Sequence, residues 1–438
     1  MFMNNFEKAL MDMDSFVAIN DVLTGVTLHP KQCIDVVKML YKKKAIVIYD
    51  TGTGKTLLAA AFMKLLLNQD PSRRFVFFCK KDQVIQTPKK LESLTGLPVL
   101  CSSSDAKSVR EKILSQDMYK YRIILLTKEC LFNEKVLNRL YEMRSDITGI
   151  IIDEAHELNN TSYASSSEML QALVSKFEYV IALTATPIRT DIKQLAKLAN
   201  LVDACSYSNP VKLLRSLQSG KFSLAEEPCF FINRKASELG RVSEPIGHVI
   251  WCSPMAQQVQ EQRGGVALMQ VCKGAGATSQ VNSLIELLHS KKGKRGLVYI
   301  SQDSIYKWVR SYLDKTDIRY RVIQGETPTY ERAEIMEAFN DPDDQSIDVV
   351  LLSVTTAIDL DCDFVVFYEF TVDVEQMIGR AHRGLENKQL DVYFLITKGT
   401  REVNYFVENI LMRCEAIAKI LGKENTAVKQ AGEEIGYS

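Results

Sequence analysis

The chain has 438 residues, which is too long for one ordinary hydrophobic core and suits two domains of common size. Hydrophobic residues make up 46% and charged residues 25%, a profile typical of soluble globular proteins, and 54 basic residues balance 54 acidic ones. A net charge of zero argues against a protein that coats nucleic acid by bulk charge, although a local basic cleft needs only a few lysines, arginines and backbone N–H groups.

The cysteines and the N-terminal segment argue against secretion and membrane insertion. The ten cysteines include no C-x-x-C pair and the five histidines lie far apart, so neither a disulfide framework nor a zinc site is expected. Acidic residues interrupt segment 1–14, unlike a signal peptide, and no apolar run reaches the roughly 18 residues of a membrane span. We therefore expect a soluble, cytoplasmic protein without a membrane partner.

Short apolar runs alternate with helical patterns between residues 45 and 200. Runs that are rich in branched or aromatic residues and bounded by polar ones are typical of strands buried on both faces of a parallel sheet. Segments with helical spacing, at 57–67, 106–115 and 168–177, can form the crossovers. The strand candidates are 45–49, 75–79, 123–126, 150–152 and 180–183. This alternation predicts a doubly wound α/β domain.

A second series of the same kind begins near residue 281. Its strand candidates are 296–300, 320–323, 348–352, 364–367 and 392–396, and its helical segments include 302–312, 329–340 and 401–421. The stretch between the two series contains several prolines and glycines and is interpreted as a connector, and the polar tail after Gly422 is expected to fray. The predicted domain boundaries are 1–205, 206–276 for the connector, 277–422, and 423–438 for the tail.

Segment 49–56 reads YDTGTGKT and joins a predicted strand to a predicted helix, which is the context of a phosphate-binding loop. Its glycines let backbone N–H groups face phosphate oxygens, Lys55 can reach the β- and γ-phosphates, and the Thr56 hydroxyl can bind Mg²⁺. Tyr49 stands where the general G-x-x-x-x-G-K-T form has its first glycine, so a glycine-rich turn without a ligand is the alternative. The predicted nucleotide-binding residues of the loop are Thr51, Gly52, Thr53, Gly54, Lys55 and Thr56.

An acidic pair, Asp153 and Glu154, follows a hydrophobic strand about 100 residues after this loop. Asp153 is placed to hold Mg²⁺, directly or through water, and Glu154 to orient and deprotonate an attacking water. A carboxylate pair after a strand is commonplace and often only caps a helix. The pair and the loop in one α/β unit, however, predict an ATPase that uses ATP and Mg²⁺.

Segment 153–156, DEAH, followed by segment 183–187, LTATP, resembles a superfamily 2 helicase. The resemblance makes Thr184 and Thr186 a coupling element between the ATP site and a nucleic-acid track, with His156 as a contact. Taken alone, LTATP is better interpreted as a strand end with a turn.

Two further segments extend the resemblance. Segment 28–32, LHPKQ, is similar to the family's adenine-recognition segment, with Gln32 as the candidate for the base edge. Segment 376–383, QMIGRAHR, resembles the family's arginine-finger motif, whose two arginines lie one helical turn apart on one face. Such arginines can meet the γ-phosphate across a domain cleft, whereas the simpler interpretation is an amphipathic helix with solvated arginines. The residues that the motif implicates are Gln376, Arg380 and Arg383.

The finer resemblance is to the Swi/Snf-like branch, over roughly residues 28–412. It is carried by the segments 268–272, 279–288, 297–302, 319–328 and 392–402. It implies two tandem RecA-like doubly wound parallel-sheet domains of the α/β class, with an ATP cleft between them. Segment 353–360 lacks the glycine-rich loop usual in the branch, which weakens the expected backbone contact there, although Thr355 could still bond a phosphate.

The predicted nucleic-acid track consists of polar residues that directly follow strands, where ligands bind in open α/β sheets. No aromatic-rich strand suggests base stacking, which favours tracking of the backbone. Exposed lysines are, however, often only solubilising charge. The track residues are Lys80, Lys81, Thr127, Ser301, Gln302 and Thr355.

The sequence therefore predicts a monomeric, DNA-stimulated ATPase that acts as a helicase or translocase on duplex, forked or branched DNA, in replication, recombination or repair. RNA is the less favoured substrate. Two alternatives remain: an ATP-gated binding switch or motor subunit that serves a partner such as a nuclease, and a phosphate-loop enzyme acting on a small molecule. The arginine motif in a second α/β unit argues against the last of these.

Overall fold

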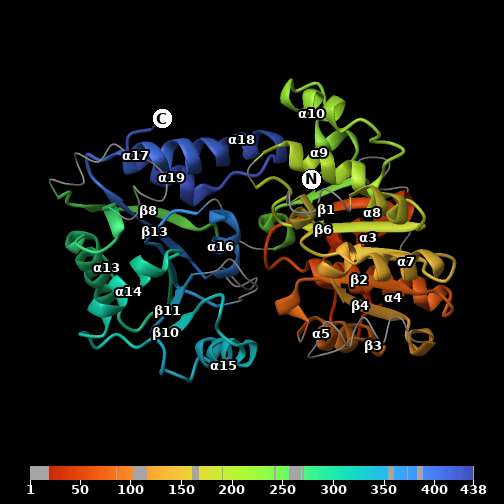
Figure 1. The fold of residues 1–438 in the computed structure, drawn as a ribbon, viewed down its shortest axis with the longest axis horizontal. Helices are drawn as coiled ribbons and strands as arrows, with labels where there is room; N and C mark the ends of the chain where they lie inside the picture. The colour runs from red at the N-terminus through yellow and green to blue at the C-terminus, as the bar shows by residue number, and fades with distance from the viewer. Residues whose placement is uncertain are drawn as a thin grey trace. The chain divides into compact units, whose positions relative to one another are not determined.

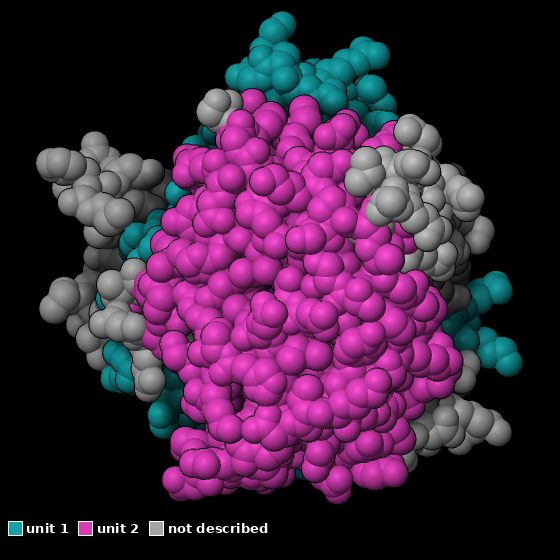
Figure 2. Space-filling view, turned by 90° about the vertical axis from the view of Figure 1, so that its left-hand side faces the viewer, with its two compact units in different colours: residues 1–239 teal, residues 240–438 magenta. Residues whose placement is uncertain are grey.

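The structure is a computed structural model that describes residues 19–84, 86–101, 116–159, 167–189, 191–240, 243–255, 268, 271–353, 360–371, 373–381 and 388–437. The chain separates into two compact units, Met1–Leu239 and Gly240–Ser438, which Figure 2 shows in different colours. Within the described ranges, none of the helices combines the length and the apolar character that crossing a membrane demands.

The first unit is built on a seven-stranded sheet in the order β3-β4-β2-β5-β6-β1-β7, and all its neighbouring strands are parallel. Every residue of β2, β4, β5 and β6 is buried, because helices cover both faces of such a sheet. The strands are β1 Lys44–Tyr49, β2 Phe75–Cys79, β3 Val99–Leu100, β4 Ile123–Thr127, β5 Gly149–Ile152, β6 Tyr179–Thr184 and β7 Phe231–Arg234. The five strands predicted for this unit are confirmed.

Helix α4 follows β1 and is apolar around most of its circumference, as expected of a helix enclosed by its neighbours. The helix expected at 106–115 lies outside the described residues. The α-helices of this unit are α3 Pro30–Lys42, α4 Lys55–Gln69, α5 Gln86–Thr95, α7 Glu134–Glu142, α8 Ser167–Val174, α9 Lys193–Val202 and α10 Pro210–Gln218. Short 3₁₀ turns include η1 Lys81–Gln83, η2 Gln116–Lys120, η3 Lys128–Phe132, η4 Ala155–Asn159, η6 Leu224–Glu226 and η7 Ala236–Leu239.

The second unit contains a six-stranded parallel sheet in the order β10-β11-β9-β12-β13-β8. In the view of Figure 1, α13 and α14 lie on one side of these strands and α15 and α16 on the other. The strands are β8 Ile246–Cys252, β9 Gly296–Tyr299, β10 Tyr320–Ile323, β11 Val349–Leu352, β12 Phe364–Phe367 and β13 Asp391–Thr397. The helices are α13 Thr278–Ser290, α14 Asp303–Leu313, α15 Thr329–Asn340, α16 Val374–Ala381, α17 Arg401–Phe406, the π-helix η8 Val407–Leu411, α18 Met412–Leu421 and α19 Thr426–Glu434.

The connector expected at 206–276 is corrected by the strand pairing. β7 pairs with β1 in the first sheet, and β8 pairs with β13 along its whole length in the second. Both strands lie inside the predicted connector, and the two units divide between Leu239 and Gly240. The stretch therefore contributes an edge strand to each sheet.

The frayed tail expected at 423–438 is also corrected, because α19 packs on the outer edge of β8. Gly247 has no side chain at the contact, where a Cβ would lie 1.8 Å from the Ala427 carbonyl oxygen. The N–H groups of Gly247 and Val249 donate to Gln430 at 2.8 Å and to Glu434 at 2.6 Å. These contacts satisfy the edge of the sheet, which would otherwise expose unpaired backbone donors.

Candidate functional site

The loop between β1 and α4 has the backbone that a phosphate cradle needs. Gly52 and Gly54 adopt φ angles of 77° and 94°, in the left-handed region that other residues rarely enter. Gly54 is constrained a second time, because a Cβ there would lie 2.8 Å from the Gln32 side-chain nitrogen. The Thr53 hydroxyl donates to the Asp50 carbonyl at 2.6 Å and closes the turn.

Lys55 and Thr56 are the first two residues of α4, at the end of the helix where the dipole favours negative charge. The Lys55 ammonium donates to the Tyr49 carbonyl at 3.4 Å, so it lies back over the loop. The Thr56 side chain is partly exposed. Both groups are therefore available at the mouth of the loop.

Asp153 follows β5 at the same carboxyl edge of the sheet as this loop, with β6 between β5 and β1. Its carboxylate accepts the N–H of Glu154 at 3.0 Å. Burial and the neighbouring Glu154 raise the pKa of Asp153 to about 6, against the opposing influence of Lys55 and Lys128. Burial is the larger cause of this raised pKa, and a divalent cation beside the carboxylate would favour its ionised form; hydroxyl and carboxylate oxygens are ligands that Mg²⁺ accepts. Asp153 and Thr56 thus fit a magnesium ion.

Glu154 is a buried residue with a φ of 46°, one of the two non-glycine residues with positive φ in the part of the chain that the structure describes. The Lys128 ammonium donates to its carbonyl at 3.1 Å. Strained backbone of this kind costs on the order of 1–3 kcal/mol and tends to occur at functional sites. This backbone conformation determines the direction in which the Glu154 side chain projects from the end of β5.

A chain of close contacts joins the acidic pair to the LTATP segment, and its link between His156 and Thr184 is a hydrogen bond. His156 Nδ1 lies 3.0 Å from Thr184 Oγ1 and 3.3 Å from a Glu154 carboxylate oxygen. Thr184 Oγ1 also accepts the N–H of Thr186 at 3.1 Å. Burial lowers the pKa of His156 to about 4, so its ring is neutral at pH 7 and the contact with Glu154 is not an ion pair. The resemblance predicted that His156, Thr184 and Thr186 work together, and the structure brings them into contact.

Gln32 is buried and connects the adenine-recognition segment to the phosphate loop. Its side-chain nitrogen donates to the Thr53 carbonyl at 3.1 Å, and its oxygen accepts the His29 N–H at 2.9 Å. The second bond belongs to a capping box at the start of α3. The segment therefore lies directly against the loop.

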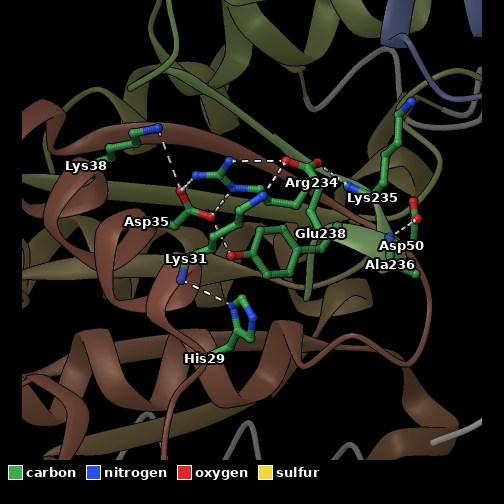
Figure 3. Close-up of polar contacts among 10 residues, drawn as sticks. His29, Lys31, Asp35, Lys38, Asp50, Arg234, Lys235, Ala236 and Glu238 are labelled. Atoms are coloured by element: carbon green, nitrogen blue, oxygen red, sulfur yellow. Dashed lines mark hydrogen bonds and ion pairs between the residues drawn. The ribbon is translucent and has the colours of Figure 1, made fainter. Parts of the chain in front are cut away.

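A buried polar network, which the sequence did not reveal, explains Tyr49. The Tyr49 hydroxyl donates to Asp35 at 2.6 Å, and Arg234 donates to both oxygens of the same carboxylate at 2.8 Å. The Asp50 carboxylate, at the start of the loop, accepts the Ala236 N–H at 2.6 Å. Figure 3 shows these contacts gathering side chains from α3, β7 and the turn after β7. The tyrosine in place of the usual glycine thus anchors the loop to α3 and β7.

The predicted track residues of the first unit differ in their surroundings. Lys80 is mostly buried and forms an ion pair with Glu157, whereas Lys81 is exposed at the start of η1. Thr127 is buried, with its hydroxyl 3.7 Å from Cys130 Sγ. Glu157, which directly follows DEAH, was not singled out from the sequence.

In the second unit, Ser301 and Gln302 share one buried carboxylate at the carboxyl edge of the sheet. The backbone N–H groups of Ser301 and Gln302 donate to Glu369 at 2.7 and 3.0 Å, and the Gln302 side chain donates at 2.7 Å. Burial raises the pKa of Glu369 despite these donors. Glu369 follows β12 and was missed, because a single acidic residue after a strand carries no specific signal.

Residues 376–381 of the arginine motif lie on α16. Gln376 and Arg380 are 4% and 7% exposed. Arg383 and Thr355 lie outside the described residues, so their predicted roles have no structural description.

Two family models match the chain, one in each unit. The first, described as "Type III restriction enzyme, res subunit", matches residues 17–189. The second, "Helicase conserved C-terminal domain", matches residues 279–384. The first match includes the phosphate loop, the acidic pair and the LTATP segment, and the second includes the arginine motif.

Curated relatives include the ATP-dependent DNA helicase fml1 of Schizosaccharomyces pombe, 23% identical over 52% of this chain and 26% of its own length. The uncharacterized ATP-dependent helicase YqhH of Bacillus subtilis is 28% identical over 36% of this chain and 26% of its own. The SWI/SNF-related regulator of chromatin subfamily A containing DEAD/H box 1 of Xenopus tropicalis is 25% identical over 50% of this chain and 22% of its own. The matched region is about a quarter of the length of these relatives.

Among solved structures, the Sulfolobus solfataricus SWI2/SNF2 ATPase core in complex with dsDNA aligns with 94% of this chain and 97% of its own. Its identity is 18% and its TM-score is 0.42, so it adds nothing to the argument. The similarity to helicases is carried instead by the two family models in tandem, the motifs within them and the relatives. These matches show a restriction-enzyme res-subunit domain followed by a helicase C-terminal domain, and the motifs within them are similar to those of Swi/Snf-like members of helicase superfamily 2.

Proposed function

We propose that this protein is an ATP-dependent DNA translocase or helicase that moves along duplex or branched DNA, acting as a monomer. The proposal is carried by one observation. The phosphate loop, the acidic pair and the His156–Thr184 hydrogen bond lie along a single carboxyl edge of the first sheet. The γ-phosphate of a nucleotide bound there would lie beside the acidic pair, and His156 and Thr184 would connect that pair to the rest of the LTATP segment. The name of one relative, the ATP-dependent DNA helicase fml1, supports DNA as the substrate.

In this proposal the loop and Lys55 hold the phosphates of ATP, and Gln32 supports the adenine end. Thr56 and Asp153 would hold a magnesium ion, which would supply positive charge beside the phosphates. Glu154 orients a water for in-line attack on the γ-phosphate and accepts its proton. The neutral His156 keeps the Glu154 carboxylate in position and connects it to Thr184 and Thr186.

The second unit would contribute Gln376, Arg380 and Arg383 to the same reaction. An arginine that reaches the γ-phosphate stabilises charge in the transition state, typically by a factor of about 10³–10⁵. Hydrolysis would then be coupled to alternate closing and opening of the two units, which advances the grip on DNA. Phosphate contacts would come from Lys80, Lys81, Thr127, Ser301, Gln302 and Thr355.

The test is ATP hydrolysis in the presence of single-stranded, duplex and forked DNA. Lys55→Ala and Glu154→Gln should each lower turnover by at least about 10²-fold, because they remove phosphate binding and the general base. Lys193→Ala and Glu142→Gln, which alter exposed ion pairs on α9 and α7, are matched controls and should behave like wild type. Full turnover in either site variant would refute the assignment.

A second candidate, an ATP-gated switch or motor subunit that serves a partner such as a nuclease, predicts DNA-stimulated hydrolysis without movement. A triplex-displacement assay separates the two. A translocase displaces the third strand in an ATP-dependent manner, whereas a static switch leaves the triplex in place. Hydrolysis that no form of DNA stimulates would argue against both.

A further inference from the structure

Three charged side chains from three neighbouring strand ends meet beside the acidic pair, and we call them the Glu157 cluster. Lys80 follows β2, Lys128 follows β4, and Glu157 lies in η4, one residue after His156. The ammonium of Lys80 contacts one oxygen of the Glu157 carboxylate, and the ammonium of Lys128 contacts the other. Lys128 also donates to the Glu154 carbonyl at 3.1 Å, so the cluster is bonded to the backbone of the proposed general base.

The cluster holds two positive charges against one negative charge. The side chains of Lys80, Glu157 and Lys128 are 14%, 23% and 7% exposed, so solvent reaches it from the side of Lys80 and Glu157. Burial alone would raise the pKa of Glu157, but Lys128 and Lys80 outweigh it and the pKa is lowered. The carboxylate is therefore ionised at neutral pH, and its oxygens occupy positions that oxygens of a phosphate diester could take.

We propose that Glu157 is an internal competitor of DNA: a backbone phosphate displaces its carboxylate from Lys80, and the exchange is relayed through Lys128 to Glu154. The proposal depends on the proposed function, because it concerns DNA binding and ATP hydrolysis. It also accounts for two lysines that face an acidic residue at a strand edge where free positive charge would serve phosphate binding.

The relay follows from the geometry. Lys128 bridges the Glu157 carboxylate and the carbonyl of Glu154, whose φ of 46° is held by its surroundings. When the Glu157 carboxylate is displaced from the lysines, Lys128 keeps its contact with the Glu154 carbonyl but loses its contact with Glu157. The turn 153–157 is then less restrained. Glu154 then moves into the orientation for attack. Without DNA, the cluster restrains hydrolysis.

The decisive variant is Glu157→Gln, which keeps the size of the side chain and removes its charge. We expect ATP hydrolysis without DNA to rise by roughly threefold or more, and stimulation by DNA to fall correspondingly. Duplex binding in the absence of nucleotide should tighten, and the salt dependence of log K should steepen by about 0.9, because one more phosphate is neutralised without a competing carboxylate. Damage to the fold would weaken binding and hydrolysis together. Glu142→Gln, an exposed carboxylate on α7, is the matched control.

A second variant, Glu157→Gln with Lys80→Ala, should lose the gain in DNA affinity, because that gain depends on the freed lysine. Wild-type hydrolysis that no DNA stimulates would overturn the proposed function itself. Normal stimulation of the wild type with unchanged affinity and salt slope in Glu157→Gln would overturn only the competitor role. If Glu157→Gln fails to fold, the single variant Lys80→Ala becomes the test. A DNA affinity and a salt dependence of log K in Lys80→Ala equal to those of the wild type would overturn the proposal.

Discussion

His156 shows how burial determines the protonation state of a side chain in the candidate site. Its ring contacts Glu154 and Thr184, yet the pKa is lowered to about 4 because burial outweighs the attraction of nearby carboxylates. A neutral ring donates one hydrogen bond in a fixed direction without adding a charge beside the nucleotide. The motif identified the residue from the sequence, but only its surroundings decide its protonation state.

The lowered pKa of His156 predicts a loss of stability in acid. A histidine with a pKa of about 6.5 in the unfolded chain and about 4 in the folded chain has no effect above pH 6.5. As the pH falls below 6.5 the unfolded chain binds the proton first, so the free energy of unfolding decreases by about 2 kcal/mol between pH 7 and pH 5. Urea unfolding at both pH values should show this loss in wild type and a smaller loss in His156→Gln. The exposed His289→Gln should match wild type, and equal losses in all three proteins would contradict the prediction.

At the scale of elements, Asp35 and Arg234 fasten α3 to β7 through a buried ion pair with two bonds of 2.8 Å. Because Asp35 is completely buried, removal of Arg234 deprives its carboxylate of two charged hydrogen bonds and leaves it with Lys38 at 3.8 Å and the Tyr49 hydroxyl at 2.6 Å. Arg234→Ala should therefore lower the free energy of unfolding by about 3–5 kcal/mol. Lys193→Ala, in an exposed pair, should change it by less than about 1 kcal/mol. Chemical denaturation of the three proteins measures the difference, and a small effect of Arg234→Ala would mean that water readily replaces the guanidinium.

The contact between α19 and β8 predicts a second effect at this scale. Gly247→Ala would push a methyl group into the Ala427 backbone and separate the helix from the edge strand, at a cost of at least about 1–3 kcal/mol. Both tryptophans of the chain, Trp251 and Trp308, lie in the second unit, so tryptophan fluorescence during urea unfolding reports on that unit. Met412→Ala, at an exposed position, should change the midpoint little. An unchanged midpoint in Gly247→Ala would show that α19 adds no stability.

For the whole molecule, the division into two units predicts that a nucleotide stabilises them unequally. ADP has no γ-phosphate for the arginines of the second unit, so its contacts should lie in the first unit. At 100 times its dissociation constant it should add about 2.7 kcal/mol to that unit alone. Calorimetry with and without ADP should show one shifted transition, while the transition followed by tryptophan fluorescence stays in place. Lys55→Ala should abolish the shift, and an equal shift of both transitions would contradict the prediction.

The sequence by itself determined the central strands and the motifs, because both depend on local patterns. A strand buried on both faces must be apolar throughout, so β2, β4, β5 and β6 are visible as short runs. The phosphate loop requires glycines and a lysine in consecutive positions, so it can be read directly.

Only the tertiary structure decided the edges of the sheets and the polar contacts between distant residues. β8 alternates in burial because it lies at an edge, and α19 looks like a loose tail until its polar side chains meet that edge. Asp35 and Arg234 are 199 positions apart, and Lys80, Lys128 and Glu157 come from three strand ends. Such contacts leave no periodic trace in a sequence, since they depend on which strand ends become neighbours once the sheet has formed.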